Sequence, residues 1–155
     1  DGHLAGEVAL ELGKYTESSD NAVKLDTEVV RDGEFDDNFL LLGGVLTNTL
    51  TKKFNEAFPA RFEGEEFPYR EISTPESTYT EDSIGLIAKA RHPEKRGKNI
   101  FIVAGIRNSG TEAAVSAFKN LETLLEGYEG GEFYRVVRGL DLDGDGEIDD
   151  YEVVE

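Results

Sequence analysis

Two short apolar runs, each ended by glycine, constrain the fold of this chain more than any other feature. The first run covers residues 39–42 and is followed by Gly43 and Gly44, and the second covers residues 100–103 and leads into Gly105. Runs without polar alternation are typical of strands buried on both faces, as in parallel sheets covered by helices. The two runs therefore predict two central strands, each ending in a tight glycine turn.

An amphipathic helix is expected after each glycine turn. Apolar residues recur there at helical spacing: Leu46, Leu50, Phe54 and Phe58 before Pro59, and Ala114, Phe118, Leu121 and Leu125 within residues 111–125. Aligning Asn38 with Asn99 also places Gly44 on Gly105, which indicates two related strand–turn–helix units. We therefore predict an α/β fold with a mostly parallel, Rossmann-like sheet.

The remaining segments give weaker signals. The first 37 residues alternate modestly at Val8, Leu10 and Leu12, which favours short strands joined by the polar link at residues 16–20. Acidic residues first and basic residues last favour a short helix over residues 81–91, and residues 63–80 read as mostly loop. We expect residues 1–37 to extend the same domain that residues 38–155 form.

Residues 141–152 fit a twelve-position calcium loop. Oxygen ligands fall at positions 1, 3, 5, 7, 9 and 12, which are Asp141, Asp143, Asp145, Glu147 (through its backbone carbonyl), Asp149 and Glu152. Gly146 occupies position 6, where the loop turns sharply. Ca²⁺ takes six to eight oxygens at about 2.3–2.6 Å, so this spacing predicts a calcium site.

The segments beside this loop do not resemble the helices of an EF-hand. Residues 133–138 are rich in strand formers, and Val153–Glu155 follow the loop, which predicts a strand–calcium loop–strand ending. A metal-free turn rich in Asp and Gly is the alternative, but it does not require Gly146, Ile148 and Glu152 at positions 6, 8 and 12. Without a helix pair to open, a calcium site here predicts a structural role and not a sensor role.

Composition excludes several functional classes. The chain has 155 residues, 38% of them apolar, and a net charge of −17, which opposes binding to nucleic acid and to anionic lipid. It has no cysteine, so disulfides and thiol catalysis are excluded, and no apolar run has the ~18–20 residues needed to insert into a membrane.

The sequence gives no catalytic motif. Gly105 to Gly110 has the glycine spacing of a P-loop, but Thr111 and Glu112 stand where Lys and Ser/Thr are needed. The glycine turns could still hold an anion at helix N-termini, although glycines that only permit tight turns, with Thr111 as an N-cap, are the favoured interpretation. His92 before a proline reads as a solvated turn residue. We expect no enzyme.

Several segments in order resemble an archaeal S-layer protein family. They are Leu40-Leu-Leu-Gly-Gly44 with Asn48, Gly85-Leu-Ile87, Val103-Ala-Gly105 with Gly110-Thr-Glu-Ala-Ala114, the terminal stretch 136–155, and Lys24-Leu-Asp-Thr-Glu-Val29 before them. The resemblance implies an α/β domain with an acidic terminal loop and strand, located outside the cell in a surface lattice.

These observations lead to two competing hypotheses. The first is a noncatalytic extracellular structural domain of an S-layer or other cell-surface assembly, stabilised by Ca²⁺ and self-associating. The alternative is a ligand-sensing α/β domain that binds an anion or nucleotide at the Gly44 and Gly105 turns. A third possibility, an acidic hydrolase, has only generic carboxylates in its favour.

Overall fold

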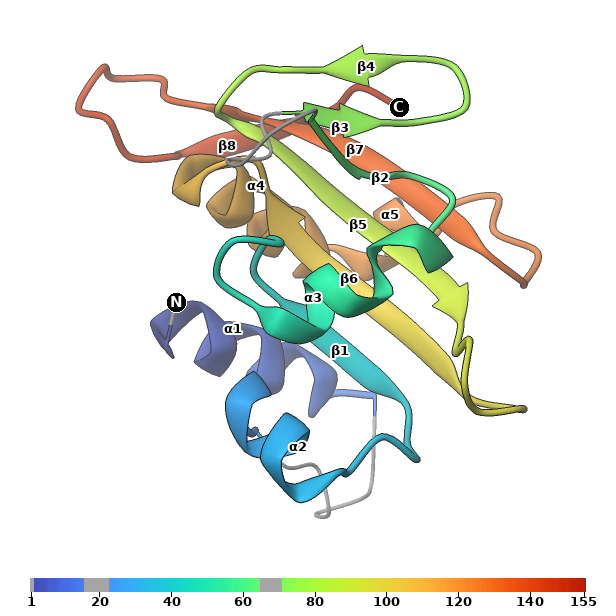
Figure 1. Cartoon of the computed structure of the whole chain (residues 1–155). Coiled ribbons are helices and arrows are strands. Elements are labelled where there is room, and N and C mark those ends of the chain that lie inside the picture. The colour runs from blue at the N-terminus through green and yellow to red at the C-terminus, as the bar shows by residue number, and fades with distance from the viewer. Residues whose placement is uncertain (1, 16–22, 65–70) are drawn as a thin grey trace.

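A computed structural model describes residues 2–15, 23–64 and 71–155, which form a main sheet and a small sheet (Figure 1). The main sheet is five-stranded, in the order β1 (Phe39–Leu42), β6 (Asn99–Gly105), β5 (Ile84–Arg91), β7 (Phe133–Leu140) and β8 (Asp150–Val153). The small sheet is antiparallel and contains β2 (Arg61–Glu63), β3 (Glu71–Ser73) and β4 (Thr78–Tyr79).

The prediction of a mostly parallel, Rossmann-like sheet is wrong. Among the described strands of the main sheet, β1 and β6 are the parallel pair, whereas β5 pairs antiparallel with both β6 and β7, and β7 pairs antiparallel with β8. The reason is that a hairpin turn, and not a crossover helix, connects β5 to β6. The chain therefore reverses direction between these two neighbouring strands. The sheet is therefore mixed.

The repeat inferred from the glycine turns does match the strand register. Phe39 lies opposite Ile100 and Leu42 opposite Val103, the same offset that aligns Asn38 with Asn99. The Asn99 backbone N–H donates to Asn38 Oδ1 at 2.8 Å where the pair begins. The two glycine turns consequently leave the sheet side by side.

The helix predicted over residues 81–91 is a strand, and it lies at the centre of the sheet. Ile84, Leu86 and Ile87 on β5 are almost fully buried, because both faces of this strand are covered. Burial on both faces, correctly expected for apolar strands, thus arises here in an antiparallel setting. The spacing of apolar residues alone does not distinguish a buried strand from one face of a helix.

Helices and the small sheet cover the two faces of the main sheet (Figure 1). One face packs against α4 (Asn108–Phe118), α1 (Gly2–Leu12) and α5 (Leu121–Leu124). The other packs against α3 (Thr49–Phe54), the short helix η1 (Asn55–Ala57), α2 (Asp26–Asp32) and the small sheet. No helix among the described residues is long and apolar enough to cross a membrane.

The strands predicted within residues 1–37 are wrong, because the described part of that region forms α1 and α2. Leu4 and Val8, four residues apart, are buried in the cluster formed with α4, while Leu10 is 77% exposed. The four-residue spacing of Leu4 and Val8 is that of a helix face, and it indicates the observed structure. The alternation of Val8 with Leu10 does not. The polar link at residues 16–20 lies outside the described residues.

The other segment predictions hold in part. Helix α3 begins at Thr49, where the Asn48 side chain caps it by accepting from the backbone N–H groups of Leu50 and Thr51. The predicted helix 111–125 is divided into α4 and α5. The described part of the predicted loop 63–80 contains β3 and β4.

Candidate functional site

The acidic loop, residues 141–152, begins directly after β7, folds into a tight turn and ends within β8. Leu140 and Asp150 are paired at its base, where the Asp149 N–H also donates to the Leu140 carbonyl at 2.9 Å. Gly144 and Gly146 have φ values of 81° and 91°. These left-handed conformations suit glycine and allow the turn that the sequence predicted at Gly146.

Three carboxylates of the acidic loop converge. One oxygen each from Asp141, Asp143 and Asp149 lies within 4.8 Å of the others, and all three residues are exposed. Asp141 also accepts from the backbone N–H groups of Gly144 and Gly146, at 2.7 and 3.0 Å. Backbone donors thus fix the orientation of a group of like charges that a cation would stabilise.

The other predicted ligands lie outside this group. The Asp145 carboxylate accepts from the Glu147 N–H at 2.8 Å, and both residues are exposed. Glu152 lies on β8 opposite Arg138 of β7, and Arg138 Nη1 donates to its carboxylate at 2.6 Å. The structure therefore groups Asp141, Asp143 and Asp149 and places Glu152 in an ion pair.

Arg138 was not anticipated from the sequence, because its contacts depend on strand register. Its Nε and Nη2 donate to Glu81 at 2.8 and 3.1 Å while Nη1 reaches Glu152. These two carboxylates, Glu81 first and then Glu152, raise the pKa of Arg138 above its usual value. Arg138 thus binds two carboxylates at once, that of Glu81 and that of Glu152, the twelfth position of the acidic loop.

A pocket of about 190 Å³ lies between the two glycine turns, where the ligand-sensing hypothesis places its site. It is lined by Gly44, Val45, Leu46, Thr47, Phe62, Gly105, Ile106, Arg107, Asn108 and Thr111. Arg107 supplies the cation, but its Nε lies 3.5 Å from the Asp82 carboxylate. Cavities that hold drug-sized ligands measure roughly 300–1,000 Å³, so this pocket is small for a nucleotide.

The glycines around this pocket serve close packing of α4. A Cβ added to Gly105 would lie 2.2 Å from the Gly110 carbonyl carbon, and one added to Gly110 would lie 2.1 Å from the Ile84 carbonyl oxygen. The N-cap of α4 is Arg107 and not Thr111. The buried hydroxyl of Thr111 instead accepts from the Gly105 backbone N–H at 3.0 Å. The glycines therefore allow α4 to pack closely on the sheet, and the N-cap role expected for Thr111 is wrong.

The interpretation of His92 as a solvated residue is wrong. Its side chain is only 4% exposed and packs against the rings of Phe39 and Phe54, with centroids 5.9 and 5.1 Å away. Its Nδ1 accepts from the Glu94 N–H at 3.1 Å. The imidazole therefore anchors the turn between β5 and β6 to the core.

Comparison with known proteins identifies a protein family. The sequence model described as "S-layer like family, outer domain" matches residues 14–121, more than half of the chain. No curated protein and no solved structure matches the chain. The matched region contains β1, β5, β6 and both glycine turns, and it ends before the acidic loop.

Proposed function

This chain belongs to the S-layer like family, outer domain, and so to the cell surface, and we propose that it is a noncatalytic structural module that self-associates in a surface assembly. The carrying observation is the family match over residues 14–121, which contains most of the sheet. A main sheet covered on both faces gives such a module a rigid body. The archaeal assignment stays a prediction from the sequence resemblance.

Calcium stabilisation of the acidic loop is the second part of the proposal. Asp141 follows β7 directly, and Asp149 directly precedes β8, so a cation held by both would tie the two strand ends together. Asp143 completes the group of three, and carboxylate oxygens are the ligands that Ca²⁺ prefers. Asp145, the Glu147 carbonyl and Glu152 are the further ligands that the loop pattern supplies.

Thermal melting with and without Ca²⁺ tests the calcium proposal. A ligand that binds only the folded state stabilises it by RT ln(1 + [L]/Kd), about 2.7 kcal/mol at a hundredfold excess over Kd. We expect Ca²⁺ to raise the melting temperature of the parent chain and of a charge-matched control, Glu122→Gln/Glu129→Gln. The Asp141→Asn/Asp149→Asn variant should show no rise, and a rise equal to that of the control would exclude the loop as the site.

Sedimentation tests the structural part of the proposal. At a net charge of −17 the copies repel one another, so we expect association to increase when millimolar Ca²⁺ neutralises carboxylates at matched ionic strength. A chain that stays monomeric at high concentration under all these conditions would contradict self-association through these 155 residues.

The ligand-sensing hypothesis is the second candidate, and the pocket at the glycine turns is the observation in its favour. Its lining contains one cation, Arg107, already near Asp82, and its volume suits a small anion better than a nucleotide. We therefore rank it below the structural role.

A further inference from the structure

The two hairpin turns of the main sheet, between β5 and β6 and between β7 and β8, carry opposite local charge. The acidic loop has seven carboxylates and no basic residue: Asp141, Asp143, Asp145, Glu147, Asp149, Asp150 and Glu152. The segment from 91 to 98, here called the basic turn, carries Arg91, Lys95, Arg96 and Lys98 against one acid, Glu94. In a chain with twice as many acidic as basic residues, this turn is a local reversal of charge.

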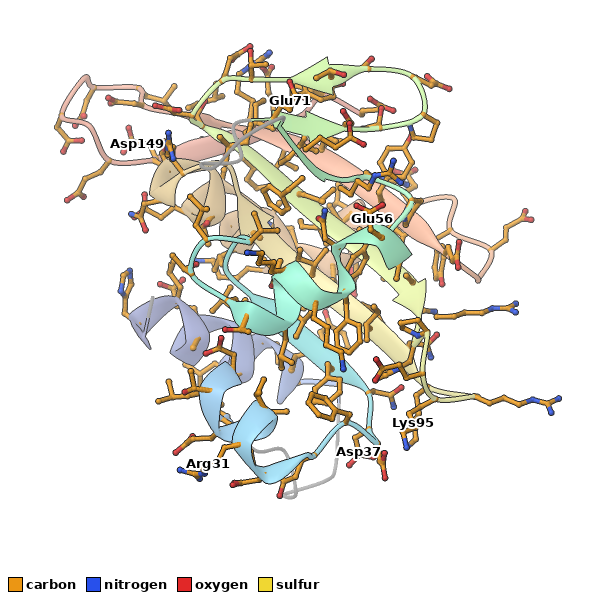
Figure 2. All side chains as sticks on the ribbon, in the orientation of Figure 1. Arg31, Asp37, Glu56, Glu71, Lys95 and Asp149 are labelled. Atoms are coloured by element: carbon orange, nitrogen blue, oxygen red, sulfur yellow. The ribbon has the colours of Figure 1, made fainter. Side chains whose placement is uncertain are left out.

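The acidic loop and the basic turn lie at opposite ends of the molecule. β5 begins at Ile84, opposite Arg138 near the acidic loop, and its eight residues end at Arg91 in the basic turn. An eight-residue strand spans about 25 Å. Figure 2 shows the same separation, with Asp149 and Lys95 labelled at opposite ends of the ribbon.

Two arginines of the basic turn are free to contact another molecule. Lys95 and Lys98 already pair with Asp36 and Asp37. Arg91 and Arg96 are exposed and form no ion pair with any residue that the structure describes. Guanidinium groups of this kind bind carboxylates in a bidentate manner, which favours an acidic partner.

Contacts within the chain anchor the basic turn. The buried His92 ring anchors it, and the His92 backbone N–H donates to the Lys98 carbonyl at 2.9 Å. Gly97 adopts a φ of 80°, which closes the turn. A turn that is already ordered loses little conformational entropy on binding, so its exposed arginines form an efficient contact surface.

We propose that the acidic loop of one copy docks on the basic turn of the next copy, head to tail. The proposal rests on the self-association proposed above and names the two surfaces that meet. Because the surfaces differ, the contact is heterologous, and their position at opposite ends of the molecule favours an open array over a closed ring. Glu147 and Asp150 offer exposed carboxylates outside the Asp141–Asp143–Asp149 group, so calcium and this contact are compatible.

A second copy fits the basic turn better than other polyanions do. Nucleic acid and anionic lipid present extended negative charge, which the rest of this −17 chain repels. The acidic loop projects beyond the main sheet between β7 and β8 (Figure 1), so it can reach the basic turn of another copy. The match is therefore between two local surfaces and not between whole molecules.

A charge-swap experiment on the full chain tests the contact. One variant, Arg91→Glu/Arg96→Glu, makes the turn acidic, and the other, Glu147→Lys/Asp150→Lys, reverses part of the loop while sparing the carboxylates proposed for calcium. The control Arg31→Glu/Lys52→Glu carries the same charge change as the turn variant, on exposed residues of α2 and α3. Association is measured by sedimentation at low ionic strength, and circular dichroism checks the fold of each variant.

We expect each swapped variant alone to associate about tenfold or more weakly than the parent and the control, because like charges then meet at the contact. An equimolar mixture of the two variants should recover association, since the substituted positions of turn and loop then carry opposite charges and the unsubstituted turn and loop form the parent contact. Association unaffected by either variant overturns this contact and leaves self-association intact. Loss without recovery in the mixture also overturns it, and a parent chain that never associates overturns both proposals.

Discussion

The guanidinium of Arg138 holds the carboxylate of Glu152 at 2.6 Å across the β7–β8 pair. Glu152 fills the last ligand position of the acidic loop in the sequence pattern, yet it does not join the Asp141–Asp143–Asp149 group. Arg138 is therefore an internal competitor for the carboxylate that a calcium ion would recruit. If the loop binds calcium as proposed, part of the binding free energy is spent on separating this ion pair.

Replacing Arg138 by glutamine should tighten calcium binding about two- to fivefold. Partly exposed ion pairs contribute roughly 0.2–1 kcal/mol, and about 1.4 kcal/mol corresponds to a tenfold change in Kd. Calorimetric titration of Ca²⁺ measures the change. Arg91→Gln removes the same charge at the far end of β5 and controls for the general increase in negative charge, so equal affinities in the two variants would show no specific competition.

A methyl group at Gly85 should destabilise the fold by about 3 kcal/mol or more. Its Cβ would lie 2.3 Å from the Gly110 carbonyl oxygen and 2.9 Å from the Ala114 Cβ, so α4 would have to move away from β5. The matched control is Gly6→Ala in α1, where nothing lies within 4 Å and alanine favours the helix by up to about 1 kcal/mol. Urea unfolding measures both, and similar stabilities would contradict the close packing of α4 on β5.

Local sequence signals were sufficient for the strands β1, β6 and β7, because continuous apolar residues or strand formers mark them. They failed for β5, since Ile84, Ile87 and Ala88 fit one helix face as well as a strand buried on both sides. Pairing with β6 and β7 decides between the two, and that pairing is a tertiary property. The same limit explains why a parallel sheet was expected: the hairpin between β5 and β6 cannot be inferred once β5 is read as a helix.

The acidic loop was visible in the sequence because its carboxylates are close neighbours along the chain. Asp141, Asp143 and Asp149 converge through local backbone contacts, which a sequence pattern encodes. The Arg138–Glu152 pair was not visible, because it depends on the register between β7 and β8. Sequence reasoning therefore identified the candidate ligands but not the residue that competes with the ion for one of them.

Nucleotides should not bind the pocket at the glycine turns with a Kd below ~100 µM, which corresponds to about −5.5 kcal/mol. The pocket is small, and its cation Arg107 lies beside Asp82. Titration of ATP and of inorganic phosphate measures this. Arg107→Gln is the appropriate probe, because any side chain at Gly105 would collide with the backbone of α4. Saturable binding lost in Arg107→Gln would place the ligand-sensing role above the structural one.

A cluster of three hydroxyl groups around Glu155 joins the small sheet to the main sheet. The Glu155 carboxylate accepts from Tyr134 at 2.6 Å, from Tyr79 at 2.8 Å and from Thr74 at 3.0 Å. Burial raises the pKa of Glu155, but the three hydrogen bonds together lower it by more than burial raises it. The net shift of the pKa is therefore downward. The carboxylate is thus held in its charged form, and the hydroxyls are held protonated.

Tyr134→Phe should lower the free energy of unfolding by about 1–2 kcal/mol at pH 7, the contribution of a hydrogen bond to a charged acceptor. The hydrogen bond to Glu155, followed by burial, raises the pKa of Tyr134 from 10.0 to about 12. Because the folded-state pKa is the higher one, this stability is complete below pH 10 and is lost as the pH rises from 10 towards 12. Urea unfolding across that range should therefore show a steeper loss in the parent chain than in Tyr134→Phe. The control Tyr15→Phe, at an exposed tyrosine, should follow the parent, and parallel pH profiles for all three chains would contradict a role for the Tyr134–Glu155 bond.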